Sequence, residues 1–181
     1  MKLDYMKQII LIFTVANLFL LACDTKQDHD IQTTSDMNQH IVKKKVTIKA
    51  EPAAVWDALT NPEKTKKYFF NCKVFSDWQP GSAITFKGKI FLVKKIELNG
   101  KIVKIEPEKL LQYSLKNGNG KDDSSGFSTV TDRLSYKNGE TTLSITDDVG
   151  KGEDSEKRFK RSEKGWDKVL KGLKELVEEG G

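Results

Sequence analysis

The chain has 181 residues, of which 31 are Lys or Arg, 26 are Asp or Glu and two are Cys. Hydrophobic residues make up 37% of it, which is enough for one core and excludes a disordered chain. Two cysteines exclude a disulfide-stapled mini-protein and a four-thiolate zinc site, and a net charge of +5 does not by itself identify a nucleic-acid binder.

The residue pattern at the N-terminus predicts a secretion signal. Lys2 and Lys7 precede an apolar run from Ile9 to Ala22, which as a helix would reach about 21 Å and fall short of a ~30 Å hydrocarbon core. Leu20-Leu21-Ala22-Cys23 resembles the bacterial lipoprotein signal, in which the cysteine is lipidated and becomes the new N-terminus. We therefore expect residues 1–22 to be a lipoprotein signal peptide. The alternative for Cys23 is a thiol beside an ordinary signal-peptidase site.

Residues 23–40 are polar and show no periodicity, which indicates a flexible tether before a domain at 41–179. Lipidated Cys23 would anchor this domain to a membrane, in the bacterial cell envelope and outside the cytoplasm. Only two histidines occur, His29 in the tether and His40 at its end, and both are expected to face solvent. No histidine is then available inside the domain as a base or a metal ligand.

The domain begins with a half-buried strand and two short helices. Alternation over Ile41–Lys49 places Val42, Val46 and Ile48 on one face. Pro52 then suits the first turn of a helix that continues to Thr60. Asn61 and Pro62 predict the N-cap and first position of a second helix, which carries Tyr68, Phe69 and Phe70 at its end.

Strands separated by turn signals follow. Strands are predicted at 72–78, 82–87, 89–98, 101–106, 110–116, 127–136 and 140–147. Hairpin turns are predicted at Asn99-Gly100 and Asn138-Gly139, and a polar, glycine-rich loop at 117–126. The inward side chains of the last two strands are expected to be Val130, Leu134, Tyr136, Leu143 and Ile145.

The C-terminal segment from Asp154 to Glu179 predicts one long amphipathic helix, with Trp166, Leu170 and Leu173 on its apolar face. A curved antiparallel sheet must cover one apolar face, and this helix is the only element long enough to do so. The fold class is therefore α+β, a curved antiparallel sheet wrapped around a long C-terminal helix, with two short helices after the first strand.

This layout resembles the SRPBCC superfamily, also called START-like or helix-grip proteins. Within it, the chain is most similar to the family named after the activator of the heat-shock-protein-90 ATPase. The stretches that carry the likeness are residues 50–63 with Val55-Trp56, Trp78-Gln79-Pro80-Gly81-Ser82, residues 100–113 and Gly165-Trp166. The resemblance implies a cavity for apolar ligands between sheet and helix. We do not transfer the chaperone activity, because a lipoprotein outside the cytoplasm would not meet a cytosolic chaperone.

Few side chains are candidates for chemistry. Alternation with Val130 aims Asp132 inward, whereas a β-bulge would place Arg133 there instead, and a solvated face is the ordinary expectation for either charge. Tyr113 and Tyr136 would line a cavity or pack in the core. Cys72 is expected to be a buried, inert thiol.

Aromatic residues complete the set of ligand-binding candidates, which is Phe69, Phe70, Trp78, Tyr113, Asp132, Tyr136 and Trp166. Phe69 and Phe70 would gate the mouth of the cavity that the resemblance implies. Gly165 and Gly172 lie on the flank of the long helix, where either a close approach of a strand or room for a ligand would explain them. The basic residues of 151–164 and Lys64, Lys66 and Lys67 indicate a solvated face or apposition to an anionic membrane.

The leading hypothesis is a membrane-tethered binding domain for a small apolar or amphipathic molecule. The alternatives are an enzyme of the cyclase or hydrolase type, which needs at least two of Asp132, Arg133, Tyr113 and Tyr136 in the cavity, and a chaperone-like interaction module, which needs an exposed apolar patch. No catalytic residue, metal, cofactor or nucleic-acid partner is predicted, because no phosphate loop, nucleophile elbow or metal-spaced cluster occurs.

Overall fold

The computed structural model describes residues 40–90, 94–116, 126–152 and 154–180. The predicted signal peptide, Cys23, His29 and nearly all of the tether lie outside these residues. Asn38–Gly181 forms one compact unit. No helix in the described part of the chain is both long and apolar enough to cross a bilayer.

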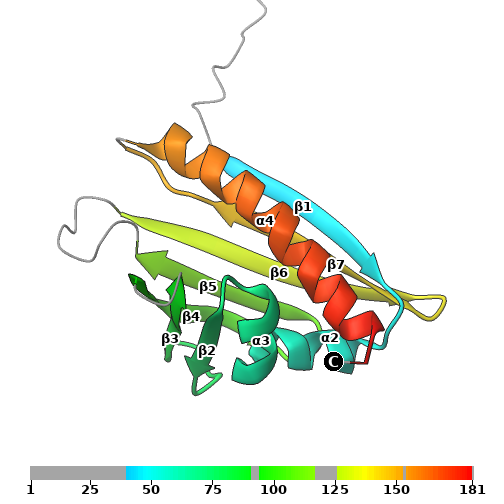
Figure 1. The fold of residues 1–181 in the computed structure, drawn as a ribbon. Helices are drawn as coiled ribbons and strands as arrows, with labels where there is room; N and C mark the ends of the chain where they lie inside the picture. The colour runs from blue at the N-terminus through cyan, green and yellow to red at the C-terminus, as the bar shows by residue number, and fades with distance from the viewer. Residues whose placement is uncertain (1–39, 91–93, 117–125, 153, 181) are drawn as a thin grey trace, which may run out of the picture. The chain divides into compact units, whose positions relative to one another are not determined.

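Seven antiparallel strands form one curved sheet in the order β1-β7-β6-β5-β4-β3-β2. The strands are β1 (Ile41–Ile48), β2 (Cys72–Ser76), β3 (Ala83–Ile90), β4 (Lys94–Glu106), β5 (Leu110–Lys116), β6 (Phe127–Lys137) and β7 (Glu140–Asp148). Two short helices, α2 (Pro52–Thr60) and α3 (Pro62–Tyr68), follow β1, and the long helix α4 (Ser155–Glu178) ends the domain. Figure 1 shows α4 lying across one face of the sheet. The predicted helix-grip fold is confirmed.

The two short helices begin where the sequence indicates. Pro52 occupies the first turn of α2, where its missing N–H costs nothing. The side chain of Asn61 accepts a hydrogen bond from the backbone N–H of Glu63 over 3.0 Å and so caps α3. Tyr68 at the end of α3 connects the two helices, because its hydroxyl donates a hydrogen bond to the carbonyl of Ala58 in α2 over 2.9 Å. The chain therefore leaves α3 with Phe69 and Phe70 in a fixed position.

Helix α4 is fastened to one side of the sheet by polar contacts. Lys44 on β1 pairs with Asp167 over 2.8 Å. Lys174 donates to the carbonyl of Thr47 over 2.7 Å, and Glu178 accepts from the backbone N–H of Lys49 over 2.8 Å. Val169, Leu170 and Leu173 on the apolar face are buried in the core. These contacts hold α4 along β1 and leave its other flank facing α3.

One predicted hairpin turn is wrong. Asn99 and Gly100 lie inside β4, which runs without interruption from Lys94 to Glu106. Gly100 is paired with Ile84 on one side and Leu115 on the other. A Cβ atom there would lie 1.6 Å from the backbone oxygen of Ser114. The glycine therefore serves the close approach of β5, a role that the Asn-Gly pattern does not distinguish from a turn.

The second Asn-Gly turn is confirmed. Asn138 and Gly139 have φ of 54° and 80°, as a two-residue hairpin between β6 and β7 requires. The prediction that Tyr136 points inward is wrong, because its side chain is 45% exposed and its hydroxyl donates to Glu51. Tyr136 lies close to the hairpin, beyond the part of β6 that the core covers.

Candidate functional site

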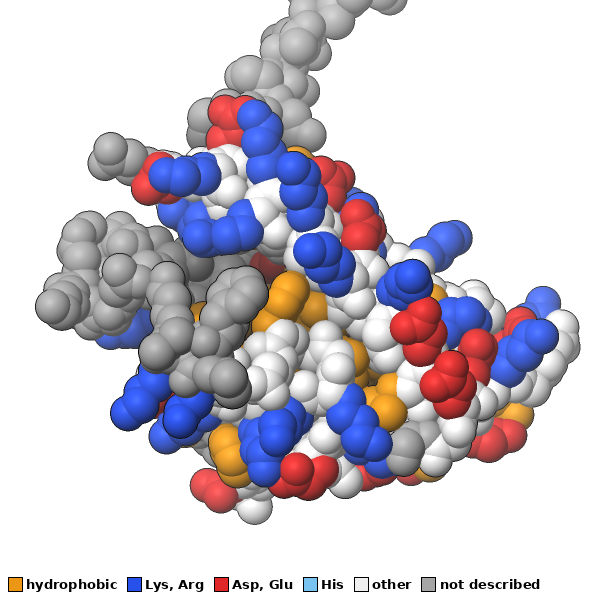
Figure 2. Space-filling model, viewed as in Figure 1, with side chains coloured by type: hydrophobic (Ala, Val, Ile, Leu, Met, Phe, Trp, Pro, Cys, Tyr) orange, Lys and Arg blue, Asp and Glu red, His pale blue; other side chains and the backbone are white. Residues whose placement is uncertain are grey.

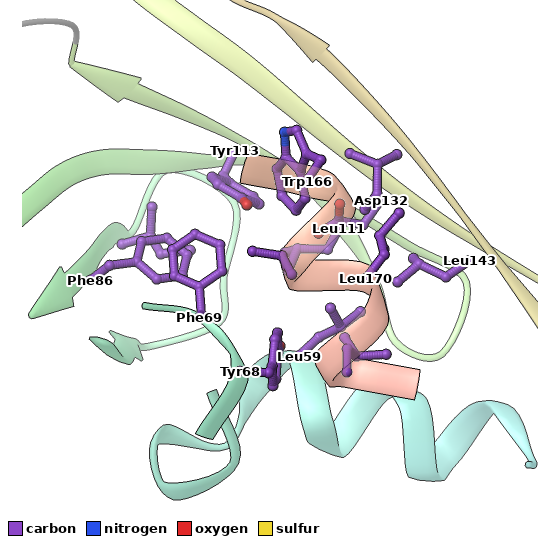
Figure 3. Close-up of a pocket in the computed structure, with 14 residues that line it drawn as sticks. Leu59, Tyr68, Phe69, Phe86, Leu111, Tyr113, Asp132, Leu143, Trp166 and Leu170 are labelled. Atoms are coloured by element: carbon purple, nitrogen blue, oxygen red, sulfur yellow. The ribbon is translucent and has the colours of Figure 1, made fainter. Parts of the chain in front are cut away.

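A small cavity lies between α4 and the sheet, with a volume of about 20 Å³. Its walls come from the short helices, four strands and α4, and most of its lining is apolar, as Figure 3 shows. The apolar lining residues are Leu59, Phe69, Ile84, Phe86, Leu111, Leu143, Ile145, Val169, Leu170 and Leu173. The polar ones are Tyr68, Tyr113, Asp132 and Trp166. A cavity of this size holds about one water molecule.

Asp132 on β6 is the acidic residue among these lining residues, and its side chain lies in the core. Its side chain is 2% exposed, whereas its neighbour Arg133 faces solvent. The expectation of a solvated Asp132 is thus wrong. The sheet does contain a β-bulge, but it lies in β4 between Ile102 and Lys104. Alternation along β6 is therefore undisturbed at Asp132.

Burial determines the protonation of Asp132. Loss of water raises the pKa of this carboxyl to about 8, and the nearby charge of Asp147 adds to the rise. The group is therefore mostly protonated at neutral pH and can donate a hydrogen bond. Its Oδ1 atom has no hydrogen-bond partner within the described chain. A buried, partnerless oxygen costs about 1–3 kcal/mol.

Tyr113 on β5 is the second polar group of the cavity. Its side chain is 3% exposed, and its ring lies 5.8 Å from that of Phe86. Burial, and then the charge of Asp132, raises the pKa of Tyr113 well above 10. Figure 3 shows its hydroxyl directed toward the centre of the lining residues. Tyr113 and Asp132 together offer two hydrogen-bond donors to the cavity, whereas Tyr68 and Trp166 already donate to Ala58 and Asp147.

Asp147 on β7 was not among the sequence candidates. Its Oδ2 atom accepts hydrogen bonds from Trp166 Nε1, over 3.0 Å, and from the hydroxyl of Ser162. Burial raises the pKa of Asp147, and these two hydrogen bonds oppose that rise. Its Oδ1 atom has no partner within the described residues. Alternation with Leu143 and Ile145 on β7 was the signal that pointed to an inward Asp147.

Aromatic rings close the cavity on the side of α3. Phe69 stacks on Phe86 with a centroid distance of 4.8 Å and meets Trp166 edge-on at 6.2 Å. Phe70 is 44% exposed and contacts Phe69 at 5.8 Å. Phe69 and Trp166 line the cavity, and Phe70 lies outside its lining. The aromatic gate is therefore Phe69 with Trp166, with Phe70 on its outer side.

The two glycines of α4 allow this close packing. A Cβ atom at Gly165 would lie 3.6 Å from the ring of Phe70, and one at Gly172 would lie 3.1 Å from Cβ of Tyr68. The residues that approach α4 therefore belong to the end of α3 and its exit, and not to a strand as expected. The glycines bring α4 and α3 together and close the cavity at this edge.

The remaining candidates lie elsewhere. Trp78 is half-buried and packs against the core, with a φ of 55°. Cys72 is buried and free as expected, and burial raises the pKa of its thiol. His40 is not fully solvated, because its ring lies 5.9 Å from that of Phe159. Within the described residues, no group of His, Cys, Asp and Glu is arranged to hold a metal ion.

Comparisons with known proteins agree on the family. The family described as activator of Hsp90 ATPase homolog 1-like protein matches residues 49–178. Among curated proteins, none matches the chain. Many solved structures share the fold.

Three of these structures illustrate the similarity. Protein MLL2253 from Mesorhizobium loti is 20% identical with a TM-score of 0.65, over 78% of this chain and 98% of that one. ChR145 from Cytophaga hutchinsonii is 33% identical with a TM-score of 0.60, over 77% of this chain and 94% of that one. The Aha1 dimer from Colwellia psychrerythraea is 21% identical with a TM-score of 0.62, over 77% of this chain and 97% of that one.

Proposed function

The chain belongs to the activator of Hsp90 ATPase homolog 1-like family, and we propose that it is a lipid-anchored envelope protein whose START-like domain binds a small apolar or amphipathic molecule. The ligand would lie between the sheet and α4, with its one polar group against Asp132 and Tyr113. The observation that carries the proposal is the partnerless, buried Oδ1 atom of Asp132 beside an apolar cavity. Such an atom lowers stability while it has no partner, and the polar group of a ligand would supply one.

The chemistry of the lining restricts the ligand. A protonated Asp132 and the hydroxyl of Tyr113 both donate, so the matching group is a hydrogen-bond acceptor such as a carbonyl oxygen. The rest of the lining is apolar and would contact hydrocarbon. Neutral ligands are favoured, because an ion would lose its hydration in this closed space.

The cavity must widen to admit a molecule larger than water. Polar contacts tie α4 to β1 and β7, whereas α4 meets the exit of α3 through the rings of Phe69 and Phe70 and the two glycines. The aromatic contacts are the ones that can separate without breaking a hydrogen bond. We therefore place the entrance between α4 and the exit of α3, where Phe69 meets Trp166.

Solvent extraction of the purified domain, followed by mass spectrometry, tests the proposal directly. The affinity of the site is measured with the fluorescent probe 1-aminoanthracene. Tyr113→Phe removes one buried donor and should weaken probe or ligand binding about 2- to 10-fold. Tyr136→Phe makes the same chemical change on an exposed tyrosine and should have no effect. Absence of both an extracted ligand and probe binding would contradict the ligand-binding proposal.

The lipid anchor has its own experiment. Cys23→Ser should abolish incorporation of a labelled fatty acid and release the protein from membranes. Cys72→Ala is the matched control, since Cys72 is the only other cysteine and is buried in the domain. Undiminished labelling of Cys23→Ser would show that the anchor is elsewhere.

An enzyme is the second candidate function, because Asp132 and Tyr113 meet in the cavity as that hypothesis required. A carboxyl with a pKa of about 8 is suited to donate or accept a proton near neutral pH. The enzyme hypothesis predicts that the wild type converts an extracted ligand, detected by mass spectrometry, and that Asp132→Asn does not. The binding hypothesis predicts that both proteins leave it unchanged.

The third alternative, an interaction module, required one exposed apolar patch. The large exposed apolar side chains of the described residues lie at the end of α3 and on β2, β4 and β6, namely Phe70, Phe75, Val103, Phe127 and Tyr136. This spread over four parts of the domain counts against the single patch that the interaction module requires.

A further inference from the structure

Phe70 has an unusual position for a large apolar residue. It is 44% exposed, and its backbone is left-handed with a φ of 49°, as is that of Asn71 with a φ of 58°. Left-handed backbone is costly for a residue with a Cβ atom, and two in succession need support from their surroundings. Asn71 supplies it by donating from its side chain to the carbonyl of Lys89 over 2.8 Å. The domain thus holds an aromatic ring at its surface.

The flank of α4 that meets Phe70 is positively charged. Gly165 lies against Phe70, and Arg161 and Lys168, four residues before it and three after it, share its side of the helix. Lys164 lies beside them on the exposed surface. None of these three cations forms an ion pair within the described residues. The acidic residues of this part of α4, Glu163 and Asp167, face the opposite side and pair with Lys44.

A second group of cations lies on the other side of Phe70. Asn71, the next residue, lines a shallow groove together with Glu97 and five lysines, which are Lys66, Lys73, Lys87, Lys89 and Lys95. Lys87 pairs with Glu97, and Lys73 pairs with Glu63. Lys73 is opposite Lys87 in the sheet, and Lys89 is opposite Lys95. Like charges opposite one another destabilise a sheet. Lys66, Lys89 and Lys95 form no ion pair within the part of the chain that the structure describes.

Basic side chains therefore surround an exposed ring. Figure 2 shows Lys and Arg side chains along the N-terminal half of α4 and again over α3 and β2, with hydrophobic side chains between the two groups. We propose that this face, defined by Phe70, Arg161, Lys164, Lys168 and the five groove lysines, docks on the surface of an anionic lipid bilayer. Phe70 would enter the interface while the cations meet lipid headgroups.

Two observations favour a bilayer over an acidic protein or a nucleic acid. One is the isolated aromatic ring in the middle of the charges, which suits the boundary between headgroups and hydrocarbon. The other depends on the proposed anchor at Cys23. The 16 residues from 24 to 39 reach at most about 55 Å when fully extended. A lipidated chain would keep this face within reach of the membrane.

Docking is tested with residues 38–181, which contain the compact unit and its core and lack the proposed anchor. The domain should cosediment with vesicles of phosphatidylglycerol mixed with phosphatidylcholine, and not with vesicles of phosphatidylcholine alone. Each basic residue near an anionic surface contributes about fivefold, so Arg161→Ala with Lys168→Ala should weaken binding about 25-fold. Phe70→Ser should weaken it further, and added salt should reduce it.

Matched variants separate the face from net charge and hydrophobicity. Lys43→Ala with Lys45→Ala removes two exposed cations from β1, at the opposite edge of the sheet, and should leave binding within about twofold. Val103→Ser, which removes an apolar side chain 51% exposed on β4, should likewise have no effect. Circular dichroism verifies that each variant is folded. An equal loss in the control variants, or no vesicle binding by the wild type, would overturn the proposal.

Single-stranded DNA distinguishes the bilayer from other polyanions. The wild-type domain should bind anionic vesicles in the presence of competing DNA. Binding to DNA without binding to vesicles would assign the face to a nucleic acid and reject membrane docking. None of these measurements involves Cys23 or the cavity, so failure of docking leaves both parts of the proposed function standing.

Discussion

Trp166 on α4 donates a hydrogen bond from its indole Nε1 to Oδ2 of Asp147 on β7, over 3.0 Å. One contact thereby fixes three features of the domain. It fastens the long helix to the sheet, it supplies a buried carboxyl with a partner, and it orients the ring that closes the cavity against Phe69. The polar and the apolar parts of the site consequently depend on one another.

Replacement of Trp166 should show how much its hydrogen bond to Asp147 contributes to stability. Trp166→Phe keeps an aromatic ring but removes the donor, and should lower the free energy of unfolding by about 1–3 kcal/mol because Asp147 is buried. Urea denaturation measures the change. In a double-mutant cycle with Asp147→Asn, the two substitutions should couple by at least about 0.5 kcal/mol. Trp78→Phe, at a half-buried position, is the control, and additive effects of Trp166→Phe and Asp147→Asn would contradict the contact.

Asp132 should make stability depend on pH. In the unfolded chain its carboxyl ionises near pH 4, whereas in the folded domain its pKa is raised to about 8. Between these values the folded state retains a proton that the unfolded state has lost. Stability due to this group therefore falls as pH rises from about 4 to 8, by up to about 1.4 kcal/mol per pH unit.

Asp132→Asn tests this dependence, because an amide stays neutral over the whole range. Urea titrations at several pH values should show a smaller decline for the variant, which should be the more stable protein near pH 8. Arg133→Gln changes an exposed charge on the same strand and should keep the wild-type decline. An unchanged slope in Asp132→Asn would mean that other groups, Asp147 among them, cause the pH dependence.

The two glycines of α4 should respond differently to alanine. Alanine is favoured over glycine in a helix by about 1 kcal/mol. At Gly165 the new Cβ would make an ordinary contact of 3.6 Å with Phe70, so Gly165→Ala should stabilise the domain. At Gly172 the contact with Tyr68 would be 3.1 Å, so Gly172→Ala should gain less or lose stability. Thermal melting of the two variants shows which is the more stable. A higher Tm for Gly172→Ala than for Gly165→Ala would show that Tyr68 and α3 shift easily to admit the new Cβ.

Gly100→Ala should be much more harmful. Its Cβ would lie 1.6 Å from a backbone oxygen of β5, so the strands must separate locally. We expect a loss of about 3 kcal/mol or more, or an insoluble protein. Asn99→Ala changes the exposed neighbour in the same strand and should cost less than about 1 kcal/mol. Equal, small effects of the two substitutions would support the hairpin turn that the sequence pattern predicted.

Local patterns predicted much of the architecture. The helix start at Pro52, the cap at Asn61, the alternation along β1 and the 3.6-residue period of α4 all depend on neighbours in the chain. The structure confirms each. The Asn-Gly pairs show where such reasoning fails. Asn138-Gly139 forms the turn, but Gly100 is fixed by a strand that comes later in the sequence. A local pattern carries no information about which backbone will approach it.

The candidate site follows the same division. The sequence by itself determined the α+β fold, the inward period of β7 and of β6 as far as Leu134, and the candidates Tyr113, Asp132, Phe69 and Trp166. Only the tertiary structure decided that Asp132 is buried without a partner for Oδ1, that Asp147 holds Trp166, and that Tyr136 lies outside. The reason is that protonation and hydrogen bonding depend on the water and the partners that remain after strands distant in sequence and α4 pack together.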